Sequence, residues 1–125
     1  MISQLFVLSS RGDVLVNRDF RADLPHGTPE LFYRQLRRGE PGQPAAFALE
    51  GVAFFFLRRA GLFLVCTARQ PPAAALALEL LEQLAALVRS FCGALSEEAL
   101  RLNAVLVYEL LDELIDYGHP RAPPP

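Results

Sequence analysis

The sequence predicts an α+β domain in which a five-stranded, mainly antiparallel sheet carries one helix on one face and two on the other. Two observations support this fold class. Apolar residues recur with a period of two through most of residues 1–70, which is typical of strands, and with a period of 3.6 from Pro71 onward, which is typical of helices. Strands that are apolar on both faces need helices on both faces. With 125 residues, 52% of them hydrophobic, the chain has room for one domain with a real core.

The chain opens with a predicted β-hairpin. Residues 2–8 are largely apolar, which indicates a strand buried on both faces. Turn-forming residues occupy 9–13, and the strand pattern resumes at 14–16. The turn contains the adhesion tripeptide Arg11-Gly12-Asp13, which we interpret as ordinary turn chemistry, because Gly and Asp are favoured in turns.

A helix with clear end signals follows the hairpin. Thr28 suits the N-cap, Pro29 suits the first helical position, and Glu30 complements the positive end of the helix dipole. Apolar residues within 31–36 form the stripe that should face the sheet. Gly39 stands where a helix-terminating glycine belongs.

The next three segments read as strands. Residues 46–50 predict a short strand at a sheet edge, whereas 52–57 and 62–67 predict strong, buried strands. The last two are joined by a turn at 58–61, which makes a second hairpin.

Two helices complete the domain. Pro71-Pro72 opens a helix rich in Leu and Ala that runs to about Cys92. Ser96 caps a second helix, which runs to about Tyr117. We expect the domain to span residues 1–119 and a proline-rich linker to begin at residues 120–125.

The net charge of −2 conceals an uneven distribution. Residues 1–70 hold nine arginines against six acidic residues, and residues 71–125 hold three against eight, so the two parts carry +3 and −5. Neither part contains a polybasic tract that could grip phosphates along a nucleic acid. We therefore expect no nucleic-acid partner.

The cysteines and the apolar segments indicate the compartment. Cys66 and Cys92 lie in apolar segments of a Cys-poor chain, which favours buried thiols in a reducing environment; the sequence leaves open whether they lie close together. The longest apolar stretch, 73–88, is interrupted by Glu79 and Glu82. We expect a cytoplasmic protein, free or peripheral to a membrane.

Catalytic motifs are scarce. Each of the two histidines, His26 and His119, lies beside Pro or Gly in a predicted loop, and neither has a neighbour at metal-ligand spacing. The sequence contains no Gly-rich phosphate loop, nucleophile elbow or zinc signature. We therefore expect no catalytic residue, no cofactor and no metal, and we interpret the chain as not an enzyme.

The last predicted helix carries an acidic stripe. Its members lie three, four and seven positions from the first and share one helix face: Glu109, Asp112, Glu113 and Asp116. Such a stripe is either a solvated face or a docking surface for a basic partner.

The same helix also carries two apolar stripes, although a helix that only covers a sheet needs one. The first stripe comprises Leu100, Ala104, Val107, Leu111 and Leu114, and the second comprises Leu102, Leu106 and Leu110. The second stripe needs either the neighbouring helix or an outside partner.

The first helix has a basic edge formed by Arg34, Arg37 and Arg38, and Arg58 and Arg59 lie in the second hairpin turn. These arginines are either solvated or bind an acidic partner or anionic lipid headgroups. We keep the three helix arginines as candidate partner-binding residues, together with the acidic stripe.

Three segments resemble one known family. Residues 1–13 read MISQLFVLSSRGD, residues 18–21 read RDFR, and residues 108–118 read YELLDELIDYG. They are similar to the N-terminal longin domain of adaptor-complex mu (medium) subunits. The resemblance extends from Met1 to about Pro120 and implies the fold argued above, so the fold class is longin-like.

The resemblance also implies a function. Mu subunits are non-catalytic parts of heterotetrameric vesicle-coat adaptor complexes, which sort cargo at trans-Golgi and endosomal membranes. The implied partners are a large beta-type subunit that holds this domain, the other adaptor subunits and, indirectly, an Arf-family GTPase that recruits the complex. Cargo tails would be bound only by a C-terminal domain that is absent from this sequence. The alternative is a regulatory longin module of a SNARE or of a small-GTPase-binding platform.

Overall fold

The computed structural model describes residues 1–38, 45–116 and 119–120. Five strands form one sheet in the order β2-β1-β5-β4-β3, and every neighbouring pair is antiparallel. These strands are β1 (Gln4–Leu8), β2 (Val14–Asp19), β3 (Ala46–Leu49), β4 (Val52–Arg59) and β5 (Leu62–Ala68). The predicted α+β class with a five-stranded antiparallel sheet is confirmed.

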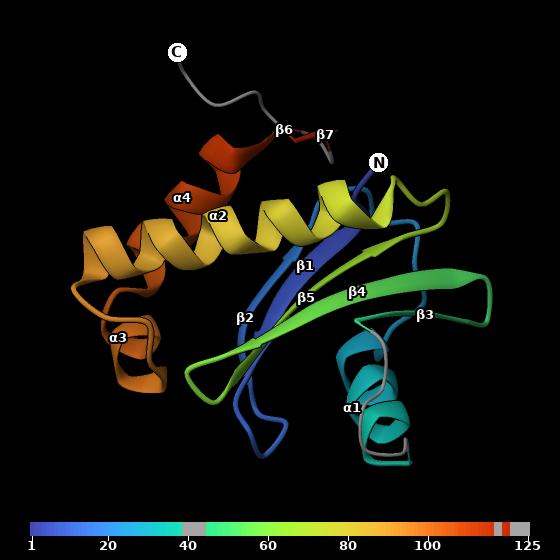
Figure 1. Ribbon diagram of the computed structural model, residues 1–125, viewed down its shortest axis with the longest axis horizontal. Helices are drawn as coiled ribbons and strands as arrows, with labels where there is room; N and C mark the ends of the chain where they lie inside the picture. The colour runs from blue at the N-terminus through green and yellow to red at the C-terminus, as the bar shows by residue number, and fades with distance from the viewer. Residues whose placement is uncertain (39–44, 117–118, 121–125) are drawn as a thin grey trace.

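Helices cover both faces of the sheet (Figure 1). One face carries α1, and the other carries α2, α3 and α4, of which α2 lies over β4 and β5 while α3 and α4 lie against β2. The helices are α1 (Thr28–Arg38), α2 (Ala74–Cys92), α3 (Glu97–Leu102) and α4 (Ala104–Leu114). A two-stranded ribbon of β6 (Ile115–Asp116) and β7 (His119–Pro120) follows.

The helix predicted from Ser96 to about Tyr117 differs from the expectation in two ways. It is divided at Asn103, whose backbone N–H and side-chain amide both donate to the carbonyl of Ala99, at 3.0 and 2.8 Å. An Asn side chain that competes for a helix carbonyl in this way favours a break. The helix also ends at Leu114, because Ile115 is extended and pairs with Pro120. The expected end at Tyr117 lies outside the described residues.

Other boundaries shift by a few residues. Strand β2 continues to Asp19, beyond the predicted 14–16, and α2 begins at Ala74 rather than at the two prolines. The second hairpin turn needs only Ala60 and Gly61, whose φ angles of 53° and 75° fit a two-residue turn. The expected linker begins inside β7 and otherwise lies outside the described residues.

An aromatic core lies between the sheet and α1. Phe32 of α1 is fully buried, and its ring centroid lies 5.2–6.2 Å from the centroids of five other phenylalanine rings. We call this set the aromatic core: Phe6, Leu8, Phe32, Val52, Phe54, Phe56, Phe63 and Val65. Its members on β1, β4 and β5 occupy alternate positions, as the period of two requires.

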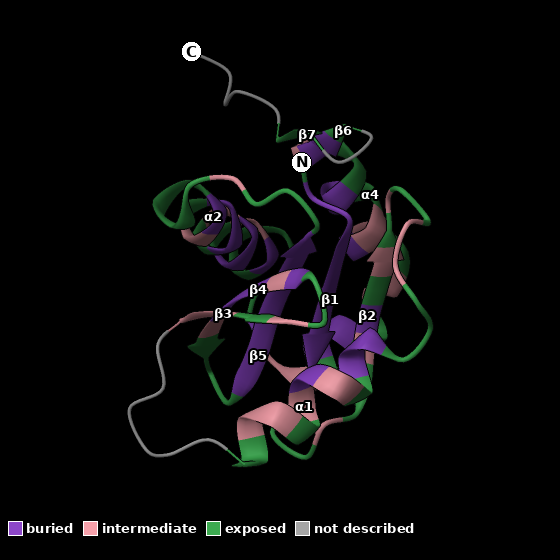
Figure 2. Cartoon of the chain, turned by 90° about the vertical axis from the view of Figure 1, so that its right-hand side faces the viewer, coloured by how far each residue is buried: buried purple, intermediate pink, exposed green. Residues whose placement is uncertain are grey.

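An aliphatic core lies on the other face, beneath α2, α3 and α4. Helix α2 contributes six buried residues to it: Ala77, Leu80, Leu81, Leu84, Ala85 and Val88. The central strands β1 and β5 are buried at every position, because each faces both cores (Figure 2). Cys66 lies in this core and burial raises the pKa of its thiol to about 12, whereas Cys92 is half-buried; both cysteines are free.

Candidate interaction surfaces

The acidic stripe predicted from the sequence lies on the outer side of α4 and β6, and all four members are exposed. The carboxylate of Asp112 accepts a hydrogen bond from the Arg18 guanidinium of β2 at 2.7 Å, so this acid is engaged within the domain. Asp116 also makes a contact of its own. Glu109 and Glu113 have no ion pair with the described part of the chain, so they remain the carboxylates open to a partner.

Tyr108 of α4 closes part of the β2 edge. Its hydroxyl accepts a hydrogen bond from the backbone N–H of Asn17 at 3.1 Å and lies 3.3 Å from the carbonyl of Asn17, to which it donates. The Arg18 guanidinium lies 5.9 Å from the centroid of the Tyr108 ring. Because β2 is an edge strand, these contacts satisfy backbone groups that no further strand pairs.

The most exposed large apolar side chains of the described chain lie at the junction of α3 and α4. Leu102 is 76% exposed and Val105 is 74% exposed. The other members of the second apolar stripe are covered, since Leu106 is half-buried and Leu110 is buried. On α3 and α4, the exposed large apolar side chains are therefore found at this junction, while Leu76 and Phe91 of α2 are also exposed.

Val105 continues into the acidic stripe. The residues four, seven and eight positions further along α4 are Glu109, Asp112 and Glu113, which is the spacing of one helix face. Leu102 ends α3 just before this face, and Asp116 follows it in β6. We call this surface the α4 outer face: Leu102, Val105, Glu109, Asp112, Glu113 and Asp116. It combines an apolar end with an acidic end, which suits a partner that presents apolar and basic groups.

The three arginines predicted on the first helix, Arg34, Arg37 and Arg38, are exposed on α1. The guanidinium of Arg37 lies 5.9 Å from the centroid of the Tyr33 ring. Arg58, expected in the second hairpin turn, lies in β4 instead, and its guanidinium carbon is 5.2 Å from the centroid of the Phe63 ring. Arg59 differs from these residues, because it forms an ion pair with Glu82 of α2.

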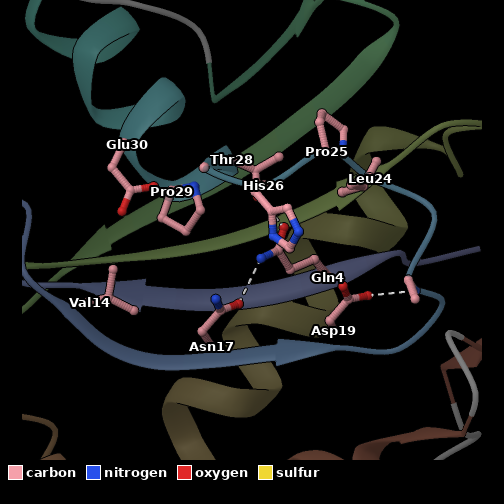
Figure 3. Close-up of a pocket in the computed structure, with 12 residues that line it drawn as sticks. Gln4, Val14, Asn17, Asp19, Leu24, Pro25, His26, Thr28, Pro29 and Glu30 are labelled. Carbon is pink, nitrogen blue, oxygen red and sulfur yellow. Dashed lines mark hydrogen bonds between the residues drawn. The ribbon is translucent and has the colours of Figure 1, made fainter.

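A groove of about 450 Å³ lies between β2 and the N-terminal end of α1 (Figure 3). Gln4 organises its floor: its side-chain amide donates to Asn17 Oδ1 at 2.7 Å, and its Oε1 accepts from the Thr28 hydroxyl at 2.5 Å. Thr28 was expected to cap the helix, but it lies inside α1 and its buried hydroxyl satisfies Gln4 instead. The polar groups of the floor thus bind one another and fix α1 on the sheet.

The two histidines and the acids form no metal site in the part of the chain that the structure describes. His26 is exposed at the rim of the groove, and His119 is exposed on β7. Within the described ranges, no helix is both long and apolar enough to cross a bilayer.

Comparison with known proteins reveals a similarity to one class of protein. No protein-family model matches the chain. It is similar, along nearly its whole length, to mu subunits of adaptor complexes. Identity is 32% over 121 residues to the AP-2 complex subunit mu of Dictyostelium discoideum, which is 97% of this chain and 28% of that protein.

The sequence identity is higher to AP-4 complex mu subunits from a plant and from mammals. The chain is 45% identical over 123 residues to the AP-4 complex subunit mu of Arabidopsis thaliana, and 46% identical over 122 residues to the AP-4 complex subunit mu-1 of Homo sapiens. Each match covers 95% of this chain and 27% of the relative. The chain therefore spans about a quarter of the length of these curated relatives.

These relatives confirm the resemblance to adaptor-complex mu subunits that three sequence segments indicated. Within the family, residues 1–13 and 30–33 look most like the mu subunit of adaptor protein complex four. The identities to the plant and human AP-4 subunits agree with this more specific resemblance.

Proposed function

We propose that the chain is a non-catalytic structural domain of a heterotetrameric vesicle-coat adaptor complex that sorts cargo at trans-Golgi and endosomal membranes. The observation that carries this proposal is the 45% identity to an AP-4 complex subunit mu across 95% of the chain. The domain docks onto a large beta-type subunit and lies beside the other subunits of the complex. An Arf-family GTPase recruits the assembly, and cargo tails bind to another domain of the full-length subunit.

The α4 outer face is the docking surface that the geometry supports. Leu102 and Val105 are each about three-quarters exposed, and burying a Val or Leu side chain against a partner contributes about 1.5–3 kcal/mol. Glu109 and Glu113 lie beside them without ion pairs to the described residues, so they can orient a basic surface. Burial of Leu102 and Val105 supplies most of the binding free energy, and Glu109 and Glu113 set the orientation of the partner.

Co-expression with the large beta-type subunit of adaptor complex four tests this proposal. We expect the two chains to co-purify, and the pair Leu102→Asp and Val105→Asp to weaken the affinity at least about thirtyfold, because losing a central interface contact costs about 2 kcal/mol or more. A matched control replaces Leu76 and Phe91 of α2, which are 51% and 60% exposed, with Asp.

Two outcomes contradict the proposal at different levels. Failure of the unmodified chain to co-purify with the large subunit would argue against the adaptor role and in favour of the regulatory longin module of a SNARE or GTPase platform. Equal loss in the α2 control pair would show that docking uses a surface other than the α4 outer face.

A further inference from the structure

We propose that one end of the domain binds the phosphate groups of an anionic phospholipid membrane. This surface, which we call the basic end, comprises Arg34, Arg37, Arg38 and Arg58. It lies on the α1 side of the sheet, whereas the α4 outer face lies on the other side, so both can be occupied at once. The inference therefore stands apart from the docking proposed above and can fail separately.

The basic end combines the C-terminal part of α1 with the end of β4, and the β1–β2 turn lies at the same end of the sheet. The C-terminal end of α1, the β1–β2 turn and the β4–β5 turn all lie at the same end of the sheet (Figure 1). Tyr33 joins two of them, because its hydroxyl donates to the carbonyl of Ser10 at 3.0 Å and its ring packs on Gly12. The fold thus places Arg58 and the three α1 arginines, 20 residues or more apart in the sequence, at the same end of the sheet.

Aromatic rings hold two of these guanidinium groups. The guanidinium carbon of Arg37 lies 5.9 Å from the centroid of the Tyr33 ring, and its Nη1 donates to the Tyr33 hydroxyl at 3.5 Å. The guanidinium carbon of Arg58 lies 5.2 Å from the centroid of the Phe63 ring. These contacts restrict the two side chains and leave other N–H groups that can donate to phosphate oxygens. The two side chains are therefore partly ordered before any ligand arrives.

The basic end is not neutralised by the described residues. Its four arginines make no ion pair there. The acidic side chains at this end, Asp13 and Glu97, are engaged with Arg11 and Arg101 instead. Arg59 pairs with Glu82. The acidic stripe lies on α4, on the far side of the sheet. Because the acidic stripe and the four arginines lie on opposite layers, a negatively charged surface attracts the basic end and repels the layer that carries the stripe.

The arrangement favours a membrane over an acidic peptide. The four side chains are exposed at the end of a helix and the end of a strand, which suits an extended array of headgroups more than a single strand of peptide. Each arginine near an anionic surface strengthens binding about fivefold, so the contact is weak alone and adds to others within an assembly.

Vesicle sedimentation tests the inference with the 125-residue chain. We expect binding to phosphatidylcholine vesicles that also contain phosphatidylserine, little binding to phosphatidylcholine alone, and loss of binding as salt rises. Arg37→Gln with Arg58→Gln should weaken binding about 25-fold, whereas Arg37→Lys with Arg58→Lys should retain most of it. The matched control, Arg69→Gln with Arg89→Gln, changes the net charge equally at exposed arginines outside the basic end and should have little effect.

Three results would overturn the inference. They are equal binding to both kinds of vesicle, an equal loss in the control pair, and displacement from the vesicles by polyglutamate at matched charge concentration, which would favour an acidic peptide as the ligand. Thermal unfolding of each variant checks that the fold is intact. Because the large subunit docks on the opposite layer, co-purification with it should be unchanged by the Arg37 and Arg58 substitutions.

Discussion

The two cores of this domain attach their helices in different ways. On one face, the 11-residue helix α1 places a single aromatic ring, Phe32, among five others. On the other face, the 19-residue helix α2 spreads its contacts over six buried Ala, Leu and Val side chains. Attachment is therefore concentrated in the aromatic core and distributed in the aliphatic core. Leu31, Tyr33 and Leu36 add partly buried contacts to α1, but Phe32 is its one fully buried aromatic ring.

Removing the central ring should have the largest effect. Phe32→Ala should lower the free energy of unfolding by about 4 kcal/mol, because it leaves a cavity among rings that one helix cannot close. Urea denaturation measures the loss, and hydrogen exchange should show α1 opening before α2. Phe91→Ala is the matched control, since Phe91 is 60% exposed and should change stability by less than about 0.5 kcal/mol. Similar effects for the two substitutions would refute concentrated attachment.

A substitution in the aliphatic core should have a smaller and less local effect. Leu84→Ala should cost about 3 kcal/mol by urea denaturation, because a buried Leu is lost but five buried neighbours on α2 remain. Hydrogen exchange should rise across α2 and the strands beneath it rather than in α2 alone. Selective opening of α2, as strong as that of α1 in Phe32→Ala, would contradict the distinction between the two cores.

Two glycine substitutions distinguish the cost of disturbing the contact between α1 and the first hairpin from the cost of backbone strain alone. Gly12 has a φ of 91°, and a Cβ at this position would lie 2.7 Å from the Tyr33 ring. Gly51 has a φ of 77° with open space around its Cβ position. We expect Gly12→Ala to cost about 2 kcal/mol and Gly51→Ala about 1 kcal/mol in thermal or urea unfolding. If the two costs are equal, the close packing of Tyr33 on the hairpin contributes nothing.

Ionisation of the Cys66 thiol in the aliphatic core should have the smallest effect on the stability of the domain. Burial raises the pKa of Cys66 from 9.0 to about 12, so the folded state holds its proton over a range where the unfolded state releases it. Stability should be unaffected by this group below about pH 9 and should fall as pH rises from about 9 to 12.

Comparison with Cys66→Ala isolates this slope from other groups that titrate at high pH. Iodoacetamide should modify the half-buried Cys92 in the folded protein and Cys66 only after unfolding. Rapid labelling of Cys66 in the folded state would contradict its burial.

The elements could be predicted because their signals are local. Alternating apolar residues revealed the strands of the sheet, and the change of period after Pro71 separated them from the later helices. The break at Asn103 was missed because Asn is compatible with a helix and its bond to Ala99 forms only when the chain turns there. The role of Thr28 was misjudged because Gln4, its partner, lies 24 residues away.

The surfaces could be predicted only in part. The sequence placed Leu102 in an apolar stripe that needs the neighbouring helix or a partner, but it did not indicate that Val105 would be exposed beside it in the sequence. The break at Asn103 ends the helical period, so Leu102 no longer shares a stripe with Leu106. The pairing of Asp112 with Arg18 links residues 94 positions apart, and no local pattern reports it. The partner-binding roles of the acidic stripe and the basic edge remain predictions.

The Tyr108 hydroxyl has a consequence for the behaviour of the protein at high concentration. An open β-edge recruits strands from neighbouring molecules and can seed aggregates, and β2 forms one edge of this sheet. At Asn17 the backbone donor and acceptor that such a strand would use are already occupied by the side chain of a helix. The side chain of Tyr108 thereby blocks strand addition at Asn17 in the folded domain, whatever else the domain binds.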